Sequence, residues 1–227
     1  MNGEKFIEAI DKKIKERSIL NHPFYQSWKS GKLTNAMLQL YAKQYYGHVA
    51  AFAQHLSAIH SRMDDFDGRK MIFQNLMDEE HGENNHPELW LRFGEALGLS
   101  RDEIKKEPAS SETSSFVNHF KSIAQKSSAE GISALYAYES QIPEVSKEKI
   151  KGLVDFYGVE TKDGLEYFNV HMQADIEHSK AERELIAKYA HDEETQQKVM
   201  AAVEQTLDAY WNMLSGVHQL CTINSEC

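Results

Sequence analysis

The sequence predicts an all-α protein, on three observations. Apolar residues recur at three- and four-residue intervals along most of the chain. No segment shows the convincing alternation of apolar and polar residues that indicates a strand, and no repeat of fixed length occurs. With 227 residues, 41% of them hydrophobic, the chain can build one helical domain with a substantial core. We expect residues 1–217 to form this domain and residues 218–227 to form a C-terminal tail.

Four helices are expected in the first half of the chain. They cover residues 3–17, the stretch from a cap at Thr34 to about Met63, the stretch from near Asp67 through NLMDEE, and Leu89–Leu97. A loop is expected over residues 21–31, because Pro23 and Gly31 punctuate it. This loop is unusually aromatic, so its large side chains must pack or bind something: Phe24, Tyr25 and Trp28.

The second half begins with the most linker-like segment, residues 100–115, which is rich in Ser, Glu and Lys and contains Pro108. Further helices are expected over residues 116–125 and 129–140, from the break at Gln141–Pro143 to Tyr157, from a cap at Asp163 to about Tyr189, and over residues 193–214.

Composition and charge exclude several classes of function. A formal charge of −10 and a pI near 5.6 argue against binding to nucleic acid or to an anionic membrane surface. Only Cys221 and Cys227 are present, so neither a disulfide framework nor a cysteine-rich zinc site is indicated. The N-terminus is charged, and no apolar stretch approaches the roughly 18 residues of a membrane span. We therefore expect a cytoplasmic protein.

The strongest chemical signal lies in YFNVHMQADIEHSKAE, where His171, Asp175 and His178 stand at positions i, i+4 and i+7. On a helix these side chains fall within an arc of roughly 60°. Neutral imidazoles and a carboxylate on one face suit zinc, iron or manganese. The same spacing also occurs on solvated polar faces, so this motif alone leaves both interpretations open.

Other segments add candidate ligands. Glu79 and His86 are seven residues apart and would share a face of an uninterrupted helix, although Pro87 puts that continuity in doubt. Glu139 lies inside an apolar helical pattern, where a carboxylate needs a strong partner unless it is exposed at the helix end. If the three segments converge, their three carboxylates would offset most of the charge of two divalent cations. Glycine-rich phosphate loops and nucleophile motifs are missing from the sequence.

Six segments resemble a known family. They are HPFYQSW, LYAKQYYGH, SAIHSRMDD, NLMDEEHGENNHPELW, ALYAYESQIPEVSKEKI and YFNVHMQADIEHSKAE. The chain is similar from about residue 5 to residue 214 to the Chlamydia protein associating with death domains and its bacterial relatives, within the haem-oxygenase-like diiron oxidases. The resemblance implies a seven-helix haem-oxygenase-like bundle. It also places the family's ligands for two divalent metal ions, iron with iron or iron with manganese, on Glu79, His86, Glu139, His171, Asp175 and His178.

The resemblance further implies a function, the synthesis of para-aminobenzoate for folate. The family's route consumes dioxygen and a reductant, and a tyrosine of the protein itself supplies the carbon. The matching tyrosine is Tyr25, and the family's amino-donor lysine matches Lys149. Tyr41, Tyr138 and Tyr167 match other tyrosines near the family site, where they could relay electrons or protons.

Rival interpretations remain open at this point. One is a metal-independent oxidase resembling pyrroloquinoline quinone biosynthesis protein C, which the pooled ligands disfavour. Thiaminase II would need a cysteine nucleophile, and haem oxygenase would need a proximal histidine, for which His22 is a weak candidate. A different class is an interaction protein that binds death-domain proteins. A homodimer is also expected, because helical proteins of this kind often pair through exposed faces.

Overall fold

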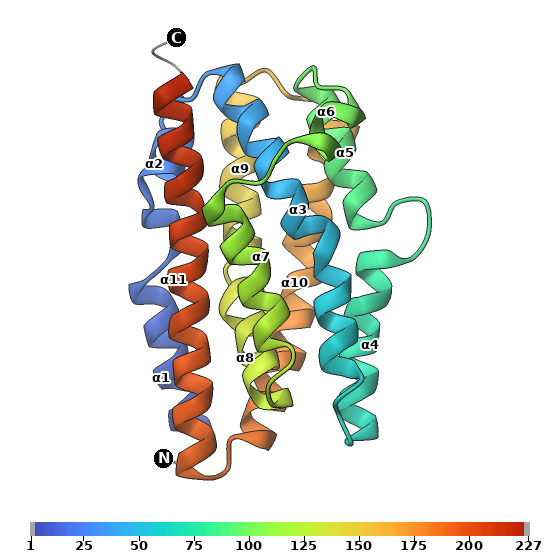
Figure 1. The fold of residues 1–227 in the computed structure, drawn as a ribbon, viewed down its shortest axis with the longest axis vertical. Coiled ribbons are helices and arrows are strands. Elements are labelled where there is room, and N and C mark those ends of the chain that lie inside the picture. Colours follow the sequence, from blue (N-terminus) through green and yellow to red (C-terminus); the bar gives the residue numbers. More distant parts are fainter. Residues whose placement is uncertain (1–2, 225–227) are drawn as a thin grey trace.

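Helices account for most of residues 3–224, the part of the chain that the computed structural model describes. In chain order they are α1 (Gly3–Glu16), η1 (Ile19–Asn21), α2 (Pro23–Lys29), α3 (Asn35–His60), α4 (Phe66–Glu80), α5 (His86–Ala96), α6 (Arg101–Lys106), α7 (Ser111–Ile123), α8 (Ser128–Glu139), α9 (Ile142–Phe156), α10 (Lys162–Tyr189) and α11 (Glu193–Asn224). The long helices run along the bundle, with α11 packed against α1, α7 and α8 (Figure 1). The predicted all-α class is confirmed, and short helices and helix breaks raise the number above the seven expected. Among the described residues, no helix is both long enough and apolar enough to cross a membrane.

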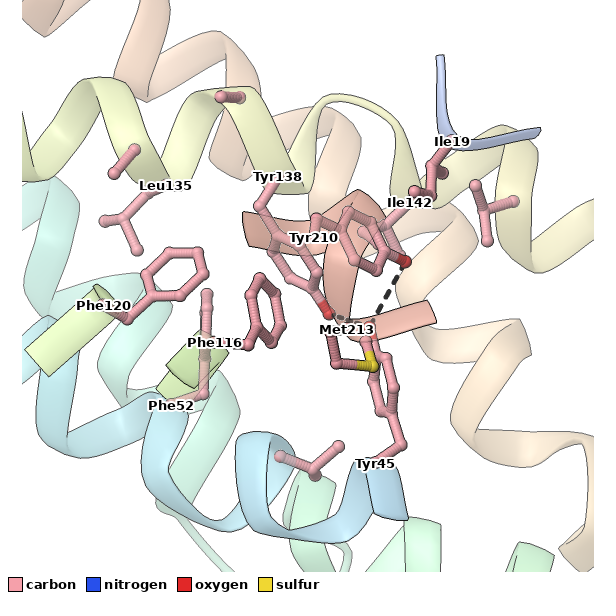
Figure 2. Packing of buried hydrophobic residues seen from close by; sticks show 14 of the residues in the cluster. Ile19, Tyr45, Phe52, Phe116, Phe120, Leu135, Tyr138, Ile142, Tyr210 and Met213 are labelled. Atoms are coloured by element: carbon pink, nitrogen blue, oxygen red, sulfur yellow. Dashed lines mark hydrogen bonds between the residues drawn. The ribbon is translucent and has the colours of Figure 1, made fainter. Parts of the chain in front are cut away.

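The core is rich in aromatic side chains. Phe52, Phe116, Phe120, Tyr138 and Tyr210 pack together from α3, α7, α8 and α11 (Figure 2). The Phe116 and Tyr210 rings stack with their centroids 5.4 Å apart, and Phe120 meets Phe116 edge-on at 5.3 Å. Each buried aromatic ring stabilises the fold by roughly 2–3 kcal/mol. This cluster therefore fixes α8 and its terminal residue Glu139 relative to α3.

The aromatic segment expected as a loop is helical, so that prediction was wrong. Pro23 occupies the first turn of α2, where a missing N–H costs nothing and the fixed φ favours a helix. The Nδ1 atom of His22 accepts a hydrogen bond from the Phe24 N–H at 3.1 Å and caps the helix. Tyr25 and Trp28 are almost completely buried. Proline thus begins this helix instead of preventing it.

The linker-like segment, residues 100–115, is also largely helical. Ser100 and Glu103 form a reciprocal capping box at the start of α6, and Ile104 buries that helix against the core. Ser110 caps α7, which begins five residues before the expected start. The Ser- and Glu-rich composition therefore reflects helix caps and solvated helix faces, while Pro108 lies in the short connection between them.

Two other helix limits differ from the predictions. Thr161, not Asp163, caps α10, because its hydroxyl accepts a hydrogen bond from the Gly164 N–H at 3.2 Å. The last helix continues ten residues beyond Leu214, to Asn224, so most of the expected tail is helical. Val217 and Cys221 extend its apolar face and are buried. The expected cap at Thr34 is confirmed, since its hydroxyl accepts from the Met37 N–H at 3.3 Å. Cys227 lies outside the described residues.

Candidate metal centre

Glu79 and His86 meet across a break between two helices. The first helix, α4, ends one residue after Glu79, and α5 begins at His86 with Asn85 as its cap and Pro87 in its first turn. The Nδ1 atom of His86 lies 2.8 Å from a carboxyl oxygen of Glu79, and both side chains are buried. The helix is thus interrupted where Pro87 suggested, yet the turn brings the two side chains together more closely than a shared helix face would.

The long helix α10 supplies donors that converge on Glu79 and on Glu139. The His171 ring lies with its centroid 4.2 Å from that of His86, so Glu79, His86 and His171 form one group of converging donors. Glu139, the last residue of α8, forms a second group with Asp175 and His178. Within each group the donor atoms lie within 4.8 Å of one another, and all six residues are buried.

Hydrogen bonds orient the imidazoles and Glu139. The Nδ1 of His171 lies 2.6 Å from the carbonyl oxygen of Tyr167, which leaves its other nitrogen for the site. Nδ1 of His178 lies 3.3 Å from Asp175, and its Nε2 lies 3.0 Å from Asp78. The Asn75 amide donates to both carboxyl oxygens of Glu139 at 3.1 Å.

The sequence analysis missed three side chains at this centre: Asn75, Asp78 and Glu182. Glu182 is 1% exposed and lies beside Glu139, whose negative charge acts with burial to raise the pKa of Glu182 well above its usual range. A helical signal for it existed, because Glu182 is eleven residues after His171 and seven after Asp175. It therefore continues the stripe formed by His171, Asp175 and His178.

The buried donors fit two divalent cations. Burial raises the pKa of Glu139 and raises that of Asp175 to about 7, while burial and the nearby His86 charge lower that of His171 well below its usual range. One oxygen of Asp175 and both oxygens of Glu182 have no hydrogen-bond partner among the described residues. Buried carboxyl oxygens are ordinarily paired or bound to metal, and this mixture of oxygen and imidazole donors suits zinc, iron or manganese. The role of the six predicted residues as ligands remains a prediction.

A small cavity, about 10 Å³ in volume, lies between the two groups of donors. It is large enough for roughly one water molecule. Its lining consists of Glu79, Glu139, His171 and Asp175 together with His48, Val49, Phe52, Tyr138 and Tyr167. Two of the predicted tyrosines thus border the candidate metal centre, and Tyr167 also lies against His171 with ring centroids 4.1 Å apart.

The other predicted residues gather in a buried cluster of hydroxyl groups. The hydroxyl of Tyr25 lies 3.4 Å from those of Tyr41 and Tyr210. Tyr45 links Tyr210 to the tyrosine at the cavity wall, since its hydroxyl lies 3.4 Å from that of Tyr210 and 2.7 Å from that of Tyr138 (Figure 2). Tyr45 and Tyr210 were not predicted as site residues, because the spacing of residues along one helix does not show which other helix they face. A hydrogen-bonded chain therefore connects Tyr25 with the cavity wall.

Lys149 lies within the same cluster. Its Nζ donates to the Tyr41 hydroxyl at 2.6 Å and lies 5.4 Å from the centre of the Tyr25 ring. The side chain is 3% exposed, and burial lowers its pKa to about 7. The ordinary expectation for a lysine between Lys147 and Lys151 is a charged surface residue. The structure instead places an amine with a large neutral fraction beside Tyr25.

Comparison with known proteins places the chain in a family. Residues 10–216 match the model of the TENA/THI-4/PQQC family. The chain belongs to that family. Among its relatives, a 4-aminobenzoate synthase of Chlamydia muridarum is 41% identical over 92% of this chain and 88% of the relative. A 4-aminobenzoate synthase of Nitrosomonas europaea is 40% identical over 100% of this chain and 96% of the relative.

More distant TENA/THI-4/PQQC relatives and solved structures agree on the fold. A pyrroloquinoline-quinone synthase of Acidiphilium cryptum is 25% identical over 87% of this chain and 81% of its own length. A heme oxygenase-like domain from Shewanella denitrificans superposes with a TM-score of 0.83, at 16% identity, over 99% of this chain and 95% of the other. A CADD-like protein from Nostoc punctiforme superposes with a TM-score of 0.76, at 20% identity, over 95% of this chain and 98% of the other. The predicted haem-oxygenase-like fold and the resemblance to the Chlamydia family are confirmed.

His22, the weak candidate for a haem ligand, has both ring nitrogens engaged. Nδ1 caps α2, and Nε2 lies 3.0 Å from the Ser215 hydroxyl. Within this member of the TENA/THI-4/PQQC family, His22 therefore fixes a helix end against α11.

Proposed function

We propose that the protein is an oxygen-dependent oxidase that uses two metal ions to make 4-aminobenzoate for folate biosynthesis. The observation that carries the proposal is the chain of buried tyrosine hydroxyls that connects Tyr25, which lies next to Lys149, with the cavity between the two donor groups. Relatives about 40% identical to this chain bear the name 4-aminobenzoate synthase. Glu79, His86 and His171 would hold one ion, and Glu139, Asp175 and His178 the other. Two bound ions, iron with iron or iron with manganese, would supply the redox chemistry that lets dioxygen and a reductant act on a phenol.

Tyr25 is the proposed carbon source. Its phenol is 1% exposed, and burial together with the neighbouring hydroxyls keeps its pKa well above the usual range, so the hydroxyl stays protonated. Phe24 and Trp28 contact the Tyr25 ring, and the Tyr41 hydroxyl contacts its hydroxyl, so these neighbours hold the ring in one position. A phenol shielded from bulk water is protected from competing reactions and keeps a fixed orientation towards its neighbours.

Lys149 is the proposed amino donor. A nucleophilic amine must be neutral, and burial brings the pKa of Lys149 to about 7, so much of it is unprotonated near neutral pH. Its Nζ lies close to the Tyr25 and Tyr41 rings, 5.4 Å and 5.1 Å from their centres. This position lets the nitrogen approach the Tyr25 ring without crossing solvent.

Tyr41 and Tyr138 would move protons or electrons between Tyr25 and the cavity. Tyr41 contacts Lys149 and Tyr25, while Tyr138 borders the cavity and contacts Tyr45. Tyr167, which also lines the cavity, would act from its place against His171.

The metal assignment is tested by replacing Glu139 with Ala. We expect the purified variant to keep its helical circular dichroism, to bind less metal and to form no 4-aminobenzoate. Glu177→Ala, which removes an exposed carboxylate from the same bundle, is the control and should behave as the unmodified protein. Normal product formation by Glu139→Ala would show that the centre is assigned to the wrong residues. Full activity of metal-free protein would favour the metal-independent oxidase instead.

The self-substrate assignment is tested by isotope labelling and intact mass. Protein labelled with carbon-13 in its tyrosine rings, exposed to oxygen, metal and reductant, should release labelled product, and its mass should fall by the lost tyrosine side chain together with the change left at Lys149 by the loss of its nitrogen. Protein labelled with nitrogen-15 in lysine should place that label in the amino group. Tyr25→Phe should yield no product. Release of product from protein of unchanged mass would exclude Tyr25 as the carbon source.

The expected homodimer and the expected binding to death-domain proteins are further proposals. Light scattering of the purified chain tests the first, and a pull-down with isolated death domains tests the second.

A further inference from the structure

His48 is a buried imidazole on α3 that the proposed reaction has not used. It is 1% exposed and is enclosed by aromatic rings, with centroids 4.5 Å from Phe116, 4.9 Å from Tyr138 and 5.4 Å from Phe52. Neither of its ring nitrogens has a hydrogen-bond partner among the described residues. Buried side-chain nitrogens are nearly always hydrogen-bonded, to protein or to ordered water. This imidazole therefore calls for a partner that is not part of the protein.

The cavity offers the space for such a partner. His48 lines it from the side of α3, while Glu79, Glu139, His171 and Asp175 line it from α4, α8 and α10. Its volume of about 10 Å³ is enough for roughly one water molecule, so only a very small molecule can occupy it and an aromatic substrate is excluded. His48 belongs to neither group of converging donors. Burial keeps the pKa of His48 well below its usual range, so the ring is neutral, with one N–H donor.

We propose that His48 positions dioxygen in this cavity by hydrogen bonding to it, a role that rests on the proposed oxidase function. Apolar walls formed by Val49 and Phe52 admit a gas, while the imidazole is the polar group on the wall formed by α3. A fixed donor near an oxygen atom stabilises the negative charge that the atom gains on reduction. His48 is a positioning residue in this scheme, because it fixes the small molecule between the donor groups and Tyr138.

His55 provides a matched control on the same helix. It lies seven residues after His48, is 4% exposed, stacks on Phe120 and has an unpartnered Nε2. It does not line the cavity. Leu at either position removes the N–H donor at similar volume, whereas Gln retains one. Comparing both substitutions at both positions separates a hydrogen bond in the cavity from the packing of a buried ring.

The test uses nitric oxide as a diatomic probe on the full chain loaded with ferrous iron, with affinity read from the absorbance of the complex. We expect His48→Leu to weaken nitric oxide binding about tenfold, His48→Gln to restore most of the affinity, and His55→Leu to change it less than about twofold. Metal content should be equal in the unmodified protein and in all the variants. The oxygen concentration that gives half-maximal product formation should rise in His48→Leu alone.

Several outcomes would overturn the role of His48. Equal nitric oxide affinity in His48→Leu and the unmodified protein would show that the imidazole makes no such hydrogen bond. A lower metal content in His48→Leu would show that His48 binds the metal directly. Equal loss in His55→Leu would make the effect one of packing. If His48→Leu does not fold, His48→Phe, which keeps a ring, takes its place. The unmodified protein failing to bind nitric oxide would also refute the proposal, whereas intact binding without product would refute only the proposed function.

Discussion

At Asp175 a proton and a metal ion compete for the same oxygens. Burial raises the pKa of this carboxyl to about 7 in the metal-free protein, and a metal ligand must be deprotonated. We predict that metal affinity rises at least about tenfold per pH unit below roughly pH 7, and that it keeps rising towards about pH 10, because the neighbouring carboxylates raise the pKa of His178 to about 10 and this imidazole must also lose its proton to bind metal. Competition with a chelator at a series of pH values measures this. Affinity that does not change between about pH 5.5 and 7 would contradict it.

At Lys149 burial links protonation to stability. The pKa is about 7 in the folded protein and near 10.5 when the chain is unfolded, so the unfolded state binds more protons between these values. The free energy of unfolding therefore gains up to about 1.4 kcal/mol per pH unit from this group as pH rises through that window. We predict that Lys149→Met is more stable than the unmodified protein near pH 7 and that the difference shrinks towards pH 10. Urea denaturation of both metal-free proteins measures it; a difference independent of pH would mean that Lys149 is not the titrating group.

At the scale of a single helix, Gly152 sets how closely α9 approaches α2. A Cβ atom there would lie 2.6 Å from the Trp28 ring, whose Nε1 donates to the Lys149 carbonyl at 3.2 Å. We predict that Gly152→Ala lowers the free energy of unfolding by roughly 1–3 kcal/mol and shifts Lys149, which slows product formation. Gly47→Ala on α3 is the control, because its Cβ would meet nothing within 4 Å. This substitution should raise the free energy of unfolding by up to about 1 kcal/mol. Chemical denaturation measures both, and equal stability changes would contradict the packing argument.

The sequence predicted long helices with a continuous apolar stripe better than short helices whose limits depend on capping residues. The long helices α3 and α10 follow from apolar stripes, and one face of α10 already contained His171, Asp175 and His178. The short helices α2 and α6 escaped prediction because proline and serine, which break helices in their interior, begin them here. Tyr45 and Tyr210 escaped because their contact depends on how α3 meets α11.

At the scale of the whole molecule, the two donor groups connect four helices: α4, α5, α8 and α10. An ion that binds only the folded chain stabilises it by mass action. We predict that two equivalents of ferrous or manganous ion raise the melting temperature by at least about 5 °C, since a protein of this size gains roughly 2–4 °C per kcal/mol. Differential scanning calorimetry with and without chelator measures the shift, and Glu139→Ala should show a smaller one. Equal melting temperatures with and without metal would argue against a centre that bridges these helices.

The burial of Tyr25 has a consequence for how often one molecule could work. An aromatic acid released from that position would begin its exit inside the protein, beneath a seven-residue helix whose Tyr25 and Trp28 are fully enclosed. Departure would require α2 to swing away, and the side chain that left could not be regrown on the same polypeptide. Supply of the vitamin precursor would then scale with translation, one chain synthesised for each molecule delivered, and the cell would control output through expression instead of through turnover.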